Sequence, residues 1–218
     1  MGQVGYKRSN YLLMRSENLL IVFAKNIVLG KVKTRLAKTV GDAEAFNVYA
    51  HLVEITERES LKMEHCDVHV HFSDVILKAL WPNNQKYVQF GNGLGERMMN
   101  AFDASFKLGY KRVIGIGSDL PDLTSEVMTR GLKALESNDT VFGPSEDGGY
   151  YLIGMNQMIP EIFINKAWST ETLLDATKTE LKELGYSCEL LEELNDVDTI
   201  EDLKASSIAE KFSYLLKY

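Results

Sequence analysis

Hydrophobic runs alternate with amphipathic stretches along the chain from residue 19 onward. The continuous apolar runs at 19–24 and 112–116 predict buried strands, because a strand inside a parallel sheet is covered on both faces. This alternation is typical of an α/β protein, and we expect a three-layer α/β/α sandwich around a mostly parallel mixed sheet. The other predicted strands are 67–72, 86–90, 139–142, 150–154 and 187–191, and the predicted helices are 43–59, 94–108, 124–136, 169–184 and 199–216.

Local signals support several of these boundaries. Thr124 and Thr199 are predicted to cap the helices that follow them, and Asp202 is the predicted partner of Thr199. Gly185 follows the helix expected at 169–184, as glycine commonly does at a helix C-terminus. We interpret residues 1–18 as a polar N-terminal extension and residues 19–218 as a single domain.

The net charge limits the partners of this protein. The 218 residues include 24 Lys and Arg against 31 Asp and Glu, which gives a formal net charge of −7. Acidity argues against binding to nucleic acid or to an anionic membrane, since both favour a positive surface. The two cysteines, Cys66 and Cys188, predict no disulfide framework and no paired metal motif, so a cytoplasmic location is expected.

Positive charge is nevertheless concentrated in the loop that follows the first predicted strand. Lys25, Lys31, Lys33 and Arg35 fall within eleven positions, and Gly30 among them permits a sharp turn. A lysine supplies a flexible point charge, and an arginine can grip two phosphate oxygens. Because ligands of α/β sheets bind beyond the carboxyl ends of the strands, this loop is a candidate phosphate site. A solvated basic turn is the alternative.

Single carboxylates follow other predicted elements. Asp119 comes soon after the strand at 112–116, where it can hold a divalent cation that bridges phosphate oxygens. A turn-forming aspartate is the alternative at this position. Asp196 and Asp198 precede the last predicted helix, where one can face a metal or both can be cap residues.

A third loop pairs two carboxylates with two glycines. Glu146 and Asp147 are followed by Gly148 and Gly149, between two predicted strands. Adjacent like charges cost energy unless a cation or a proton is shared, and glycines let the backbone approach a substrate. An acidic hairpin turn is the alternative.

Three weaker signals remain. Gly93 and Gly95 surround the start of a predicted helix, where the backbone can approach a base or a ribose. His69 and His71 share one face of a predicted strand, but no further ligand completes a zinc site, so we set zinc aside. Trp168 is a candidate pocket residue.

Taken together, these segments resemble one bacterial family. The small proteins of this family are described as glycosyltransferases of the nucleotide-diphospho-sugar transferase superfamily, which has the glycosyltransferase type A fold. The group is also similar to the molybdenum cofactor guanylyltransferases and the phospholactate guanylyltransferases. The resemblance covers residues 19–203 and rests on FAKNIVLGKVKTRL (23–36), GNGLGERM (91–98), GSDLPDLT (117–124), GPSEDGGYYLIG (143–154), WST (168–170) and DVDTIEDL (196–203).

The resemblance implies a role for each loop. Asp119 takes the place of the metal-binding aspartate of the superfamily, and Asp198 or Asp147 is the candidate second ligand of Mg²⁺ or Mn²⁺. We favour Asp198 as that ligand. The implied catalytic residues are Lys33, Arg35, Asp147 and Glu146. The implied nucleotide-binding residues are Ala24, Lys25, Gly30, Lys33, Arg35, Gly93, Leu94, Gly95 and Ser118, and the implied acceptor-binding residues are Gly148, Gly149, Tyr150 and Trp168.

The loops and the resemblance together imply a metal-dependent transferase with a nucleotide-activated donor and a small-molecule acceptor. The leading hypothesis is a glycosyltransferase that acts on a nucleotide-diphospho-sugar. The alternative is a nucleotidyltransferase that couples a nucleoside triphosphate to a phosphorylated or hydroxyl acceptor and releases pyrophosphate. A non-catalytic nucleotide-binding module is the second alternative. The sequence leaves the oligomeric state open, a homodimer included.

Overall fold

Seven strands form one mixed sheet in the computed structural model, which describes residues 16–217. Their order is β3-β2-β1-β4-β6-β5-β7, and within the described residues only β6 runs antiparallel to its neighbours. The predicted mostly parallel mixed sheet is therefore confirmed. The strands are β1 (Asn18–Ala24), β2 (Asp67–Phe72), β3 (Gln85–Val88), β4 (Arg112–Ile116), β5 (Thr140–Pro144), β6 (Tyr150–Met155) and β7 (Cys188–Leu190).

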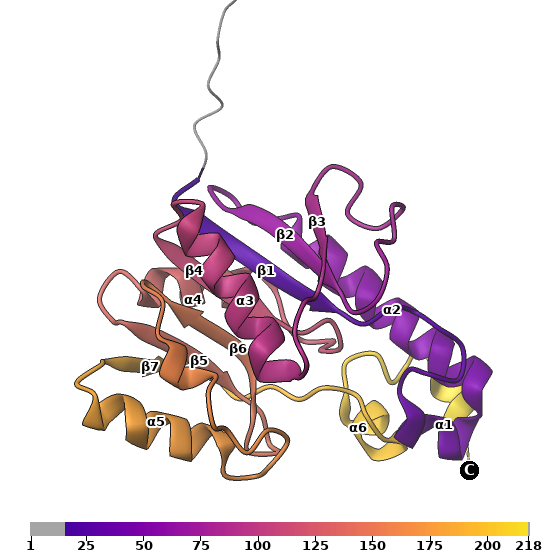
Figure 1. The fold of residues 1–218 in the computed structure, drawn as a ribbon. Coiled ribbons are helices and arrows are strands. Elements are labelled where there is room, and N and C mark those ends of the chain that lie inside the picture. Colours follow the sequence, from indigo (N-terminus) through magenta and orange to yellow (C-terminus); the bar gives the residue numbers. More distant parts are fainter. Residues whose placement is uncertain (1–15, 218) are drawn as a thin grey trace, which may run out of the picture.

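Helices cover both faces of this sheet, which confirms the predicted sandwich (Figure 1). Successive side chains of a strand point to opposite faces, so Leu20 and Val22 pack with α2 and α4, whereas Leu19 and Ile21 pack with α3 and α5. A third apolar cluster joins α1, α2 and α6 beside the sheet. The helices are α1 (Thr34–Val40), α2 (Asp42–Ser60), α3 (Leu94–Lys107), α4 (Ser125–Ala134), α5 (Leu173–Glu183) and α6 (Ile200–Ala205), with short 3₁₀ helices η1 (Pro160–Ile162) and η2 (Ser213–Leu215).

The topology brings several loops to one edge of the sheet. β1 and β4 are parallel, so the chain leaves both strands at the same edge. β6 is antiparallel to both β4 and β5, which makes β5 parallel to β4 and places the 145–149 connection at that edge as well. The basic loop and two of the acidic loops therefore meet beyond the carboxyl ends of the strands.

Two predicted helices differ from the structure. The helix expected at 169–184 begins only at Leu173, because the preceding segment turns to dock on the 145–149 loop, where the Leu174 amide donates to the Gly148 carbonyl at 3.0 Å. The helix expected at 199–216 ends at Ala205, and the chain continues in turns and η2. Its interruption falls at Ser206, whose extended backbone ends the helix.

The predicted helix caps are confirmed. The Thr124 hydroxyl accepts a hydrogen bond from the Val127 amide at the start of α4. Thr199 and Asp202 form a reciprocal capping box at the start of α6. Of the predicted N-terminal extension, residues 1–15 lie outside the described residues, and Asn18 already belongs to β1. No helix within residues 16–217 combines the length and the apolar character needed to span a membrane.

The two histidines of β2 are core residues of the α3 face. His71 is 8% exposed and stacks on Tyr87 with ring centroids 4.9 Å apart. The His69 Nε2 atom lies 3.3 Å from the Tyr110 hydroxyl. Burial, with a smaller effect from His69, lowers the pKa of His71 from 6.5 to about 4, so His71 is neutral at pH 7.

We expect this histidine to make the fold sensitive to acid. Between pH 6.5 and pH 4 the unfolded chain binds a proton at His71 that the folded chain does not, so the free energy of unfolding falls as the pH is lowered. A pKa lowered from 6.5 to about 4 corresponds to about 3 kcal/mol over this window, with no contribution above it. Urea unfolding at pH 7 and pH 4 measures the loss.

The comparison variant is His71→Phe, which removes the titrating group and keeps an aromatic ring. We expect its stability to change less between the two pH values than that of the wild type. His65→Asn, at an exposed position, serves as the control and should behave like the wild type. Equal losses in the wild type and His71→Phe would contradict the assignment.

Candidate active site

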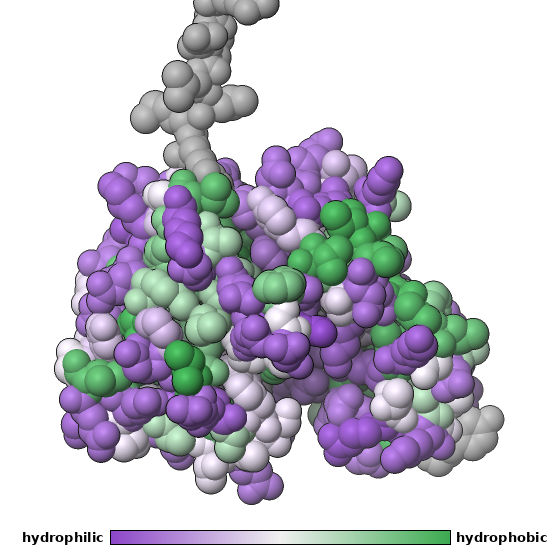
Figure 2. All heavy atoms as spheres, in the orientation of Figure 1, coloured by the Kyte–Doolittle hydropathy of each residue, from purple (hydrophilic) through white to green (hydrophobic). Residues whose placement is uncertain are grey.

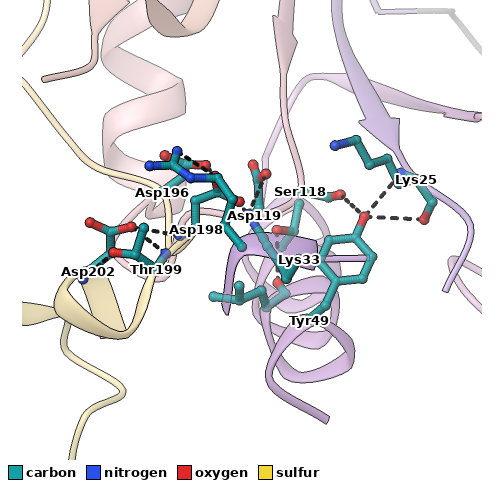
Figure 3. A network of polar contacts seen from close by, with 12 residues as sticks. Lys25, Lys33, Tyr49, Ser118, Asp119, Asp196, Asp198, Thr199 and Asp202 are labelled. Carbon is teal, nitrogen blue, oxygen red and sulfur yellow. Dashed lines mark hydrogen bonds and ion pairs between the residues drawn. The ribbon is translucent and has the colours of Figure 1, made fainter. Parts of the chain in front are cut away.

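A buried lysine occupies the centre of the network at the carboxyl edge of the sheet (Figure 3). Lys33 immediately precedes α1 and has a left-handed backbone, with φ 46° and ψ 49°. Its side chain is only 6% exposed, and its Nζ lies 2.9 Å from Asp119 Oδ2 and 3.4 Å from Asp196 Oδ2. A non-glycine residue in this backbone conformation is strained, and such residues gather at functional sites.

The charges of this network depend on one another. Burial acts to neutralise the Lys33 ammonium, but Asp119 and Asp196 outweigh it and raise the pKa of Lys33. Burial likewise acts to protonate Asp119, but Lys33 outweighs it and lowers the pKa of Asp119. At Asp196 burial and the neighbouring Asp119 dominate and raise the pKa. Lys33 and Asp119 are therefore a charged pair, with Asp196 as the more easily protonated carboxyl.

A second ion pair attaches the C-terminal segment to α1. Arg35, in the first turn of α1, places its Nη1 2.9 Å from Asp198 Oδ2. The Val197 amide donates to the Asp119 carbonyl at 3.2 Å, so the segment is also bound through its backbone. Asp202 accepts bonds from the amides of Asp198 and Thr199, which fixes the turn that presents both aspartates.

Tyr49 of α2 ties the ends of β1 and β4 together (Figure 3). Its hydroxyl accepts from the Lys25 amide at 3.0 Å, donates to the Lys25 carbonyl at 3.2 Å, and lies 3.0 Å from the Ser118 Oγ. Burial raises the pKa of Tyr49 to about 12, so the hydroxyl keeps its proton. Tyr49 lies within the helix predicted at 43–59, but no role in the site was predicted for it. A hydroxyl on a residue that faces the core is the only sequence signal that could have pointed to it.

A pocket of about 250 Å³ opens beside this network. Figure 2 shows the surface hollowed between the part that holds α3 and α5 and the part that holds α1 and α6. The pocket combines residues from β1, α3, β4, the loops after β4 and β5, β6 and the segment before α5. Among its lining residues are Phe23, Leu94, Met98, Asp119, Ser145, Asp147, Gly149, Tyr150, Trp168, Leu173 and Asp196.

The 145–149 loop directs one carboxylate into the pocket. Asp147 Oδ1 accepts from the Ser145 hydroxyl at 2.6 Å and from the Gly149 amide at 3.0 Å. Gly148 has φ +80° and lies so close to the next segment that an added Cβ would be 1.9 Å from the Glu171 carbonyl oxygen. Glu146 is exposed and lies outside the pocket-lining residues, although its amide donates to Asn195.

The two glycines at the start of α3, Gly93 and Gly95, lie in different surroundings. Gly93 is exposed at the N-terminus of α3, and Leu94 lines the pocket. Gly95 is buried beneath Trp168, since a Cβ at Gly95 would meet the indole Nε1 at 2.6 Å. Gly95 thus positions the indole that forms one wall of the pocket.

The first-strand loop is only partly brought to the pocket. Lys25 is exposed and Gly30 occupies a turn with φ +74°, closed by the Lys31 amide donating to the Val28 carbonyl at 3.0 Å. Neither residue lines the pocket. Ala24 ends β1 as a core residue. Sequence reasoning treated 24–36 as one loop, but its last residues form α1, so Arg35 projects from a helix.

The fold and the place of this site define a protein of the nucleotide-diphospho-sugar transferase type. Within that class the chain belongs to the family described as "Uncharacterized protein conserved in bacteria (DUF2064)", whose profile matches residues 58–170. No curated protein is significantly similar to it in sequence.

Solved structures support this placement. A protein from Desulfovibrio desulfuricans G20, provisionally named a nucleotide-diphospho-sugar transferase, is 30% identical, with a TM-score of 0.84 and coverage of 93% of this chain and 97% of that one. The 4-diphosphocytidyl-2C-methyl-D-erythritol synthase of Anaerococcus prevotii DSM 20548 is 10% identical, with a TM-score of 0.59 and coverage of 89% of this chain and 97% of that one. A CMP:2-keto-3-deoxy-manno-octonic acid synthetase, solved with CTP, is 10% identical, with a TM-score of 0.57 and coverage of 90% of this chain and 99% of that one. The last two likenesses show a shared fold.

We expect Gly148→Ala to disrupt the pocket loop. Gly185 has nearly the same φ, +82° against +80°, but open space around it, so the two glycines separate backbone strain from steric overlap. Gly185→Ala should cost about 1 kcal/mol of unfolding free energy from strain alone. Gly148→Ala should cost about 3 kcal/mol, because the new methyl group meets the Glu171 backbone. Urea unfolding measures both, and equal costs would contradict the close docking.

Proposed function

We propose that this protein is a glycosyltransferase that uses a nucleotide-diphospho-sugar. The observation that carries the proposal is the pairing of Lys33 with Asp119 and of Arg35 with Asp198, since Asp119 also lines the pocket. Cations from one loop and carboxylates from two others suit a diphosphate and its accompanying divalent ion. The 30% identical Desulfovibrio protein, by its name, supports the same donor class.

The two cations would bind the diphosphate of the donor. Arg35 has a side chain that is 67% exposed, so its guanidinium, paired with Asp198 in this structure, would be accessible to phosphate oxygens. Lys33 lies deeper and would stabilise the negative charge that develops on the leaving diphosphate. Both side chains would exchange carboxylate partners for phosphate oxygens when the donor binds.

The carboxylates fit a magnesium or manganese ion that arrives with the nucleotide. Among residues 16–217, no three His, Cys, Asp or Glu side chains converge closely enough to hold a metal by themselves. Mg²⁺ is usually held by one or two carboxylates together with phosphate oxygens and water, which the oxygen donors of Asp119 and Asp198 match. When bound, such an ion neutralises charge on the diphosphate.

Asp147 is the candidate base. Its carboxylate lies in the pocket wall, whereas Glu146 lies outside that wall. In the proposed reaction Asp147 accepts the proton of an acceptor hydroxyl as the hydroxyl oxygen bonds to the anomeric carbon of the sugar. The bond between that carbon and the diphosphate breaks, and the nucleoside diphosphate leaves with the bonding electrons.

We expect Asp119→Asn to lower turnover at least about 100-fold, since it removes the carboxylate that would meet both the metal and Lys33. Asp122→Asn is the matched control, because Asp122 is exposed, lies in the same loop and is absent from the pocket wall. Turnover is measured as release of nucleoside diphosphate from nucleotide-sugars. Equal activity in the two variants would contradict the role of Asp119.

We expect Lys33→Met to weaken binding of nucleoside diphosphates about tenfold or more, because a charge-assisted contact is lost. Lys38→Met, an exposed lysine in the last turn of α1, should bind like the wild type. Isothermal titration with UDP, GDP, ADP and CDP in Mg²⁺ measures both variants. An equal effect of the two substitutions would show that general charge, and not Lys33, attracts the nucleotide.

Nucleotidyl transfer is the second candidate, and the concentration of cations beside Asp119 favours it. The two reactions release different products. Incubation with nucleoside triphosphates and acceptors yields pyrophosphate in nucleotidyl transfer, whereas incubation with nucleotide-sugars yields nucleoside diphosphate in glycosyl transfer. A protein that binds nucleotides but releases neither product across a broad acceptor panel would be a binding module.

A further inference from the structure

The charge of the pocket limits what can enter it. The described residues that line it include three aspartates and no glutamate, histidine, lysine or arginine. The aspartates are Asp119, Asp147 and Asp196. Lys33, which does not line the pocket, pairs with both Asp119 and Asp196, so its single positive charge offsets part of their negative charge. Asp147 is an exposed lining residue that forms no ion pair within the described part of the chain, and its hydrogen bonds there come from Ser145 and Gly149. An anionic group placed beside Asp147 would therefore meet an uncompensated negative charge.

Other residues of the pocket wall are apolar and aromatic. Phe23, Leu94, Met98 and Trp168 line it, and the Trp168 indole stands 6.4 Å from the Tyr150 ring at 70°. A sugar ring can pack its C–H groups on such a surface, while its hydroxyl groups can donate to the carboxylates of the same pocket.

A buried hydroxyl at this wall lacks a protein partner. Tyr150 lines the pocket, and its Oη is fully buried without a hydrogen bond to any described residue. Buried polar groups in folded proteins are almost always hydrogen-bonded, so an unpaired one points to a ligand or to water. The hydroxyl can donate one hydrogen bond and accept another, and a ligand hydroxyl would reach it only by displacing the side chains that cover it.

We propose that this pocket takes the transferred group of the donor, that this group is an uncharged, hydroxyl-bearing ring, and that Asp147 excludes acidic rings. The inference rests on the proposed function, because the nucleotide would bring the ring beside Asp119. It goes beyond that function by specifying a neutral hexose over a uronic acid or a phosphorylated sugar.

The two tryptophans of the chain provide the measurement. Trp168 lines the pocket, whereas Trp81 is fully buried and bonded to Ser60, away from the pocket wall. In Trp81→Phe all tryptophan emission comes from Trp168 and reports occupancy of the pocket. Trp168→Phe is the matched control, and no ligand should change its emission. If Trp81→Phe does not fold, the wild-type signal minus that of Trp168→Phe gives the same readout.

The probes are two matched pairs that differ in one carboxylate: glucose with glucuronate, and UDP-glucose with UDP-glucuronate. We expect the neutral member of a pair to change Trp168 emission at a concentration at least tenfold lower than its acidic partner. Asp147→Asn should reduce that ratio below threefold, and Asp122→Asn should leave it unchanged.

Two results would overturn the proposal. One is binding of the acidic member as tightly as the neutral one in the unsubstituted protein. The other is no change in Trp168 emission with any of the four probes. Failure of the proposed function gives a different pattern, in which UDP alone does not bind while glucose and glucuronate still differ in the expected direction.

Discussion

A single ammonium group holds together loops that are distant in the sequence. Lys33 pairs with Asp119, 86 residues away, and with Asp196, 163 residues away, and both contacts form at the edge where β1 and β4 end. Removal of the ammonium would leave two partly buried carboxylates to repel each other across the site. The strained, left-handed backbone of Lys33 lies just before α1 begins, and from there the side chain reaches both carboxylates.

The sheet makes this meeting possible. Parallel strands deliver their following loops to one edge, and the single antiparallel strand, β6, returns the 145–149 loop to that same edge. As a result, residues of β4 and of the loop after it line the pocket together with residues from the start of α3. Gly95 has no side chain, so the indole of Trp168 can lie directly against this helix.

Sequence patterns predicted the strands well and the site in part. The runs at 19–24 and 112–116 are buried on both faces, so their apolar character identifies them directly, whereas the strand at 67–72 is identified by its alternation of polar and apolar residues. Helix ends set by tertiary contacts were not predictable in this way: α5 begins late because the chain before it docks on Gly148. The sequence showed where charges gather, but the pairing of Lys33 with Asp196 depends on topology. The role of Tyr49 was missed because its spacing is that of a core residue.

The contribution of the C-terminal segment to the site has a consequence for biosynthesis. Asp196 and Asp198 each lie 163 residues after their partners Lys33 and Arg35, so the two cations leave the ribosome long before the two carboxylates. A nascent chain can form the β1–β4 part of the sheet before it can complete this network. No translation product that stops before residue 196 contains the full set of charges, so premature termination yields chains that lack the assembled site.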